Sequence, residues 1–295
     1  MAEWFIATVL KTVVPKGTGG SNPSCSVGRS SRTIPVRFFG FDLRMEKMNK
    51  TEIVDGLRRL GITDGDCILV HSSLKSFGHL EGGAEAVIDA LLDAVGPEGT
   101  VMVPTLTGRR EDSAEHPPVF DVRNTPCWTG LIPETLRKRA DAVRSLHPTH
   151  SAAAIGPQAE FLTKDHLRSR TPCGPDSPYM RLAELDGKAV FLGVTLYCCT
   201  LLHTVEELAE SPYHLMPDAA PARITDHQGN TFTVEVVLHD WNTERRFEAI
   251  EPVWLEKGVM TKGRVGRCDV RIVRAKPAIE TALRILKREP LFLCK

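Results

Sequence analysis

Short apolar runs alternate along this chain with longer segments of helical periodicity, and this alternation most limits how the chain can fold. The runs at 67–71 (CILVH), 100–104 (TVMVP) and 188–194 (KAVFLGV) have the apolar character of buried strands. Apolar residues recur at helical spacing in the segments 82–96, 130–139, 177–185, 200–210 and 276–289. Strands that alternate with helices predict an α/β protein.

One segment departs from this alternation. Two strand-like runs flank the turn sequence QGN within 221–240, which predicts an antiparallel β-hairpin. Short extended pieces are also expected at 142–148 and 151–156. The predicted fold is therefore an α/β/α sandwich around a mainly mixed sheet, with an added β-hairpin.

Residues 1–48 differ in composition from the rest of the chain. The stretch 15–35 is rich in Gly, Ser and Pro and has few apolar residues, which predicts a disordered leader or an extension from an upstream start codon. After it, Thr51 is a candidate helix N-cap, and apolar residues then follow at helical spacing. We expect residues 49–295 to form a single domain.

The overall charge argues against several classes of partner. Lys plus Arg and Asp plus Glu number 37 each, so we expect neither nucleic acid nor an anionic membrane as a partner. No apolar run approaches the roughly 20 residues that span a bilayer. The 8 cysteines form no C-x-x-C pair, which favours free thiols in a reducing cytoplasm. The chain also lacks the common phosphate-loop, dinucleotide, zinc-protease and esterase motifs.

Polar residues follow the first predicted strand, in the segment 68–78 (ILVHSSLKSFG). In α/β folds, ligands bind beyond the carboxyl ends of the strands. The hydroxyls of Ser72 and Ser73, together with backbone N–H groups, are suited to a phosphate or amide-rich ligand, and Gly78 permits close approach. A polar strand-to-helix turn would produce the same pattern.

A second polar segment, 144–156, contains His147 and His150. Two histidines at this spacing suggest a metal site, but neither a carboxylate nor a cysteine nearby completes a ligand set, and Pro148 between them opposes a helix. We therefore expect no metal. Ser151, which leads an apolar strand, is suited instead to bond an amide group of a ligand.

The segment 171–182 (TPCGPDSPYMRL) is a Pro- and Gly-rich connection that opens a helix. Ser177 is the expected cap of this helix, with Pro178 at its first position. Asp176 lies in the loop, where it either faces a cationic ligand or stabilises the turn.

The segment 192–207 (LGVTLYCCTLLHTVEE) is the most informative of all. If Thr200 caps the helix, His203 falls in the first turn and Glu206 follows at i+3 on the same face. A carboxylate beside an imidazole fixes its tautomer and raises its basicity, as in a general base. The alternative is a partly buried histidine paired with a surface glutamate.

The surroundings of this pair are acidic. Glu206, Glu207, Glu210 and Asp218 occur with no Lys or Arg between positions 203 and 222. This charge favours a cationic ligand, although a solvated helix face would also explain it. We interpret the cysteines at 198 and 199 as packing residues rather than nucleophiles.

Taken in order, five of these stretches resemble the aminoglycoside 3-N-acetyltransferase family, also called the antibiotic N-acetyltransferase family. The resemblance covers roughly residues 49–290 and includes the family pattern L-G-V followed by T-x-x-H-x-x-E. The matching stretches are HSSLKSFG, P-T at 104–105, HPTHSAAAIG, TPCGPDSPYMRL and LGVTLYCCTLLHTVEE.

The resemblance implies a function, a fold and a set of site residues. It implies transfer of an acetyl group from acetyl-CoA to the 3-amino group of a 2-deoxystreptamine aminoglycoside, which confers resistance. It also implies an α/β architecture distinct from that of the common acetyltransferase superfamily. The expected roles are catalysis by His203, Glu206 and Thr200; binding of coenzyme A by Ser72, Ser73, Leu74, Gly78, Thr105 and Ser151; and binding of the aminoglycoside by Asp176 and Glu207.

Several alternatives remain open at this point. The same scaffold could acetylate a different small amine, or the protein could bind aminoglycosides without turnover. The oligomeric state is a monomer or a homodimer. A metal hydrolase that uses His147, His150, His203 and Glu206 is the least favoured alternative.

Overall fold

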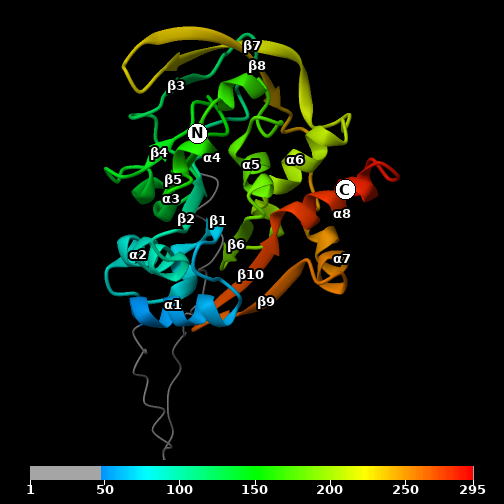
Figure 1. The fold of residues 1–295 in the computed structure, drawn as a ribbon. Coiled ribbons are helices and arrows are strands. Elements are labelled where there is room, and N and C mark those ends of the chain that lie inside the picture. Colours follow the sequence, from blue (N-terminus) through cyan, green and yellow to red (C-terminus); the bar gives the residue numbers. More distant parts are fainter. Residues whose placement is uncertain (1–47, 295) are drawn as a thin grey trace, which may run out of the picture. The chain divides into compact units, whose positions relative to one another are not determined.

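The computed structural model describes residues 48–294, and a seven-stranded sheet forms the centre of this part of the chain (Figure 1). The central strand β1 runs parallel to its neighbours β2 and β6, whereas all other neighbours pair antiparallel. From edge to edge the strands are β4 (Val143–Arg144), β5 (Ala152–Ile155), β2 (Thr100–Pro104), β1 (Cys67–Ser72), β6 (Lys188–Leu192), β10 (Cys268–Arg274) and β9 (Met260–Val265). The sheet is therefore mixed, as predicted.

Helices cover both faces of this sheet, because alternate strand residues point to opposite sides. Ile68 and Val70 of β1 pack in one apolar cluster and Leu69 in the other. The first cluster includes residues of α1 (Lys50–Arg59), α2 (Gly83–Val95) and α3 (Leu131–Leu136). The second includes residues of α4 (Ala159–Thr163), α5 (Pro178–Glu184), α6 (Thr200–Leu208), α7 (Glu251–Glu256) and α8 (Ala275–Leu286). The predicted α/β/α sandwich is confirmed.

The predicted β-hairpin is also present. β7 (Leu215–Thr225) pairs antiparallel with β8 (Thr231–His239), and β3 (Val119–Asp121) adds to β7 as a third, parallel strand. In the turn, the carboxylate of Asp226 accepts hydrogen bonds from the backbone N–H groups of Gln228 and Asn230. β8 ends at His239, beside the site described below.

The helix caps follow the expectation in one case and depart from it in another. Ser177 caps α5 and accepts a hydrogen bond from the Met180 N–H, as predicted. The cap of α1 is Asn49 rather than Thr51. Asn49 and Glu52 each accept a hydrogen bond from the other's backbone N–H, a capping box that satisfies two N–H groups at once.

β9 and β10 lie outside the elements predicted from the sequence. They extend the sheet beyond β6 and pair antiparallel with each other, from Met260 opposite Val273 to Val265 opposite Cys268. Buried and exposed residues largely alternate along the β10 sequence CDVRIVR. This period of two is a strand signal, so the sequence did contain the information.

The predicted leader lies outside the described residues, apart from Met48. Met48 is buried, and its N–H donates to the carbonyl of His79. Among residues 48–294, no helix is long and apolar enough to cross a membrane.

Candidate active site

A cavity of about 600 Å³ lies beyond the carboxyl ends of the parallel strands. Its wall includes His71 and Ser72 at the end of β1, Pro104 at the end of β2 and Val194 just after β6. This is the position at which open α/β sheets bind ligands. The remaining wall comes from the loops after β2 and β3, from α3, from the segment before β5, from the turn before α6 and α6 itself, and from the end of β8 and the segment after it. These residues are Leu106, Arg110, Trp128, Thr129, Pro133, His150, Tyr197, Cys198, Thr200, His203, His239, Trp241, Asn242, Thr243, Glu244, Arg245 and Phe247.

The L-G-V motif places a glycine where β6 ends. Gly193 has φ of 68°, and a Cβ there would lie 2.0 Å from the Cβ of Ser76, so only glycine fits. This close approach lets the turn after β1 pack on the end of β6, where the Ser73 N–H donates to the Leu192 carbonyl at 2.8 Å. The glycine therefore helps to shape the floor of the site.

α6 carries the predicted histidine and glutamate. Nδ1 of His203 lies 2.7 Å from Oε2 of Glu206 and donates to it, as the i+3 spacing predicts. The Glu206 side chain is fully buried, whereas that of His203 is 16% exposed and lines the cavity. Because Nδ1 is held by the carboxylate, Nε2 is the ring nitrogen left to exchange a proton.

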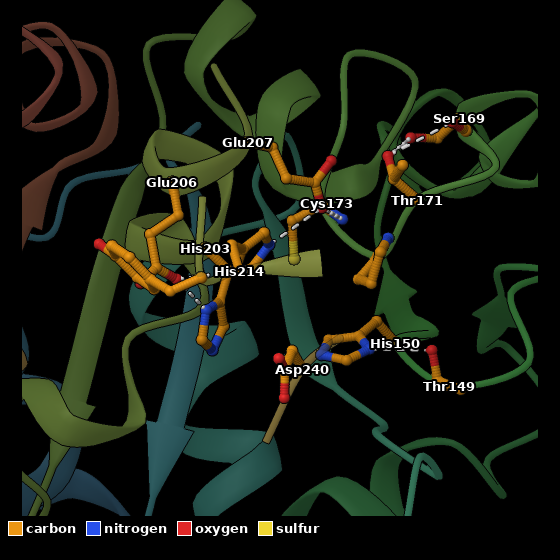
Figure 2. Close-up of polar contacts among 12 residues, drawn as sticks. Thr149, His150, Ser169, Thr171, Cys173, His203, Glu206, Glu207, His214 and Asp240 are labelled. Atoms are coloured by element: carbon orange, nitrogen blue, oxygen red, sulfur yellow. Dashed lines mark hydrogen bonds and ion pairs between the residues drawn. The ribbon is translucent and has the colours of Figure 1, made fainter. Parts of the chain in front are cut away.

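Glu206 has two further partners, shown in part in Figure 2. Nδ1 of His214 lies 3.0 Å from Oε2, and Nε of Arg245 lies 3.3 Å from Oε1. Burial alone would raise the pKa of Glu206, but the contacts with His203 and His214 outweigh it and hold that pKa well below its usual range. The carboxyl group is thus a stable anion.

The pKa values of the two histidines beside Glu206 shift in opposite directions. Burial lowers the pKa of His203 more than Glu206 raises it, so this imidazole is neutral at pH 7 and can accept a proton. Burial also acts on His214, but Glu206 and Glu207 together outweigh it, and the pKa of His214 lies above its ordinary value. His214 therefore helps to keep Glu206 anionic.

Thr200 lines the cavity but does not cap the helix. Cys199 is the N-cap residue, and Thr200 is the first residue of α6. Its hydroxyl lies 3.4 Å from Nε2 of His71, whose ring stacks on Phe191 at 4.9 Å. Burial lowers the pKa of His71 to about 3, so this ring is a neutral part of the wall.

The residues expected to contact coenzyme A occupy two different environments. Ser72 lines the cavity, and its buried hydroxyl has no hydrogen-bond partner among the described residues. Thr105 and Ser151 are fully buried outside the cavity wall; their hydroxyls lie 2.9 Å apart, and each is 3.1 Å from Nε of Arg144. Their side chains stabilise the protein interior.

The other three expected coenzyme contacts border the 3-10 turn η1 (Leu74–Phe77), which follows β1. Ser73 precedes the turn, Leu74 opens it, and Gly78 ends it with φ of 73°. Ser73 and Leu74 are partly buried and Gly78 is exposed. None of them belongs to the cavity wall.

The residues expected to face the aminoglycoside also lie outside the wall. Asp176 is 3.5 Å from the guanidinium of Arg181, and its side chain is 44% exposed. Glu207 is only 6% exposed, and its Oε1 accepts a hydrogen bond from the Cys173 N–H at 2.6 Å. The carboxylate in the wall is instead that of Glu244.

The histidines of segment 144–156 take separate roles. His147 is fully buried, and its Nδ1 accepts a hydrogen bond from the His150 N–H at 3.0 Å. His150 lines the cavity, and its Nδ1 lies 3.0 Å from the Thr149 hydroxyl. The residues of the metal-hydrolase alternative are therefore not assembled into one ligand set.

The two adjacent cysteines differ from each other. Cys199 is fully buried, and burial raises the pKa of its thiol to about 12. It is a packing residue, as expected. Cys198 is exposed and lines the cavity, so the packing interpretation is wrong for this residue.

Sequence reasoning missed the contribution of the hairpin. His214 precedes β7, His239 ends β8, and Trp241 and Arg245 follow it. Polar residues that follow a predicted strand are a signal of a site, and the sequence LHDW at 238–241 carries it. No pattern in the sequence, however, shows that this strand ends beside α6.

The chain matches known proteins along most of its length. The family model of aminoglycoside 3-N-acetyltransferase matches residues 69–287. Aminoglycoside N(3)-acetyltransferase IV from Salmonella sp is 36% identical over 246 residues, which cover 82% of this chain and 88% of that protein.

Solved structures show the same fold. AAC(3)-IVa in complex with apramycin has a TM-score of 0.70 at 32% identity and covers 84% of this chain and 95% of its own. AAC-IIIb in a binary complex with CoASH has a TM-score of 0.71 at 29% identity. The match covers 82% of this chain and 97% of the AAC-IIIb chain. The fold and enzyme class predicted from the motifs are confirmed, and this chain belongs to the aminoglycoside 3-N-acetyltransferase family.

Proposed function

We propose that this protein transfers the acetyl group of acetyl-CoA to the 3-amino group of a 2-deoxystreptamine aminoglycoside, with His203 as the general base. One observation carries the proposal. The Nδ1 of His203 is bound to a buried carboxylate at the wall of a large cavity, which leaves Nε2 for the substrate. The family membership supports the reaction class, since relatives are named as 3-N-acetyltransferases.

The reaction needs a deprotonated amine, because an ammonium group cannot attack a thioester. His203 removes a proton from the amine as the nitrogen attacks the acetyl carbonyl, and Glu206 stabilises the imidazolium that forms. A positioned general base typically contributes about 10² to 10⁴ in rate. The thiolate of coenzyme A then leaves and takes up a proton, so the acetyl group passes directly to the amine without an acyl-enzyme.

The tetrahedral intermediate carries a negative oxygen that requires hydrogen-bond donors. The hydroxyl of Thr200 is a candidate donor because it lines the cavity one helical turn before His203. Ser72, with a hydroxyl that has no hydrogen-bond partner within residues 48–294, is the candidate contact for coenzyme A. A cytoplasmic location and a role in antibiotic resistance belong to the same proposal.

The composition of the wall favours a second candidate acceptor. Of the residues that line the cavity within the described chain, Glu244 is the acidic one, while Arg110 and Arg245 are basic, Arg245 being paired with the buried Glu206. An aminoglycoside carries several positive charges and would gain little from such a wall. The alternative is the same acetyl transfer to a smaller amine of lower charge.

Release of coenzyme A thiol from the purified protein tests both candidates. The protein is incubated with acetyl-CoA and a panel of aminoglycosides, in parallel with small monoamines, and the products are identified by mass spectrometry. We expect thiol release and a singly acetylated product with at least one aminoglycoside.

Three outcomes separate the hypotheses. Thiol release with monoamines alone would favour the second acceptor class. Calorimetric binding of an aminoglycoside without thiol release would indicate a non-catalytic binding protein. An acetylated amine other than the 3-amino group would contradict the proposed regiochemistry.

A further inference from the structure

Three histidines from different parts of the chain come together at one side of the cavity. His203 lies on α6, His214 precedes β7 and His239 ends β8, and each offers a ring nitrogen within 4.8 Å of the other two. Their ring centroids are 4.6 to 5.3 Å apart. Among residues 48–294 this is the one group of three such potential ligands.

The ring nitrogens of this group are incompletely paired. Nδ1 of His239 is buried and has no hydrogen-bond partner among the described residues. Nδ1 of His214 is close to Glu206 but makes no well-aligned hydrogen bond. Buried polar atoms are normally satisfied. Nδ1 of His214 has Glu206 as an ion-pair partner, so the nitrogen that requires an explanation is Nδ1 of His239.

Carboxylates stand behind two of the rings. Glu206 binds Nδ1 of His203, and Glu207 lies 3.4 Å from Nε2 of His214. A histidine that binds a metal usually donates its other N–H to a carboxylate, which orients the ring and makes it a better ligand. The arrangement at His203 has this form, with Nε2 free for a metal.

The site is also accessible. His203 and His239 both line the cavity, so an ion can reach them and a water molecule can complete the coordination. In a tetrahedral zinc site with Zn–N bonds of about 2.0–2.1 Å, ligand nitrogens are about 3.3 Å apart. The rings must therefore turn inward by a small amount, and His203 borders open space in which to do so.

We propose that His203, His214 and His239 form a site for Zn²⁺, with a water molecule as the fourth ligand. Three imidazoles and a water match the preference of zinc for nitrogen ligands in tetrahedral geometry. Because a ligating nitrogen must be deprotonated, binding at His214, whose pKa is raised, releases any proton on that nitrogen. The ion occupies Nε2 of His203, the nitrogen that accepts the proton in acetyl transfer. Zinc is therefore an inhibitor and not a cofactor; this consequence rests on the proposed function, whereas binding of the metal does not.

Binding is measured without substrates, so its result is independent of the acetyl-transfer hypothesis. The full chain is stripped of metal with a chelator and titrated with Zn²⁺ by calorimetry and with Co²⁺ by visible absorption. We expect a single ion per chain and the intense bands of tetrahedral cobalt. His239→Ala should weaken Zn²⁺ binding by about tenfold or more, because it removes one ligand.

His79→Ala is the matched control, since His79 is exposed and outside the group. It should bind Zn²⁺ as the wild type does. Circular dichroism identifies a variant that fails to fold, and His239→Gln and His214→Gln provide further tests of the ligand set. Absence of a bound ion in the wild type, or equal affinity in the wild type and the folded His239 and His214 variants, would overturn the proposal.

Inhibition is then tested in the thiol-release assay. Zn²⁺ should reduce turnover of the wild type at concentrations near its measured dissociation constant, and excess chelator should restore it. Zinc that binds at the three histidines but leaves turnover unchanged would contradict the inhibitory role.

Discussion

Two stacked histidine pairs in this protein look alike and differ in their partners. His203 and His214 have ring centroids 5.3 Å apart, and His147 and His166 have centroids 4.6 Å apart, both with an interplanar angle of 27°. The first pair contacts the carboxylates of α6. In the second pair, His166 hydrogen-bonds with the Ser145 hydroxyl and the Pro172 carbonyl, and His147 accepts from the backbone N–H of His150.

The difference in partners affects the pKa values of the imidazoles. Burial lowers the pKa of His166 to about 3, and it also lowers that of His147, so this pair stays neutral. Beside Glu206, burial is opposed by a nearby anion, and His214 has a raised pKa. Stacked imidazoles alone therefore indicate packing; a buried carboxylate and a cavity are needed for proton transfer.

Among the variants of the two histidine pairs, replacement of the proposed base should have the largest effect on kcat. We expect His203→Ala to lower kcat by about 10² to 10⁴ with a much smaller change in KM, since the imidazole acts in the transition state. Thiol release under saturating acetyl-CoA measures it. His79→Ala, an exposed histidine variant, should keep wild-type kcat, and near wild-type turnover of His203→Ala would show that the base is another group.

Removal of the carboxylate charge should have a smaller effect. Glu206→Gln keeps the shape of the side chain but loses a charged hydrogen bond of about 1.5–3 kcal/mol, so we expect kcat to fall roughly 10- to 100-fold. The measurement is kcat of the folded variant, with circular dichroism as the check. An unchanged kcat would mean that the two histidine pairs do not differ in the way described.

Substitution in the pair of His147 and His166 should change the stability of the protein and not its kcat. In His166→Phe, the Ser145 hydroxyl and the Pro172 carbonyl each lose a buried partner. We expect a loss of about 1–3 kcal/mol in the free energy of unfolding, measured by urea denaturation, with kcat retained. A large loss of kcat in a folded variant would assign this pair a functional role.

The smallest effect is expected from the predicted leader. A chain that begins at Met48 keeps the buried methionine and the Asn49 cap, so its kcat and its midpoint of thermal unfolding should equal those of the full chain. Thiol release and a thermal melt of the two chains compare them. A large loss of either would assign a role to residues 1–47.

Local patterns explain which parts of the fold and site were predictable. The i+3 spacing of His203 and Glu206 on a helix fixes their contact, and Gly193 marks a turn that only glycine allows. Both are short-range consequences of backbone geometry. The same holds for the helix cap at Ser177 and for the hairpin turn at Asp226.

Long-range contacts were not predictable in the same way. His214 and Arg245 meet Glu206 only because the hairpin and the loop after it return to α6. Similarly, Glu207 was expected to face the aminoglycoside, but its carboxylate accepts a hydrogen bond from the Cys173 N–H of a neighbouring loop. The sequence shows that such residues are polar, while the tertiary fold decides which of them face the cavity.

The pH dependence of kcat/KM is the most direct test of His203 as a base held by Glu206. The neutral form is required, so activity should fall as the pH decreases through the pKa of His203, which lies below the ordinary value of about 6.5. Loss of the anion in Glu206→Gln should lower the pKa of His203 further, so the decrease of kcat/KM on the acid side should move to lower pH. The part of the pH profile that reflects deprotonation of the amine substrate should stay in place. An acid limb that Glu206→Gln leaves unmoved, or moves to higher pH, would contradict the account.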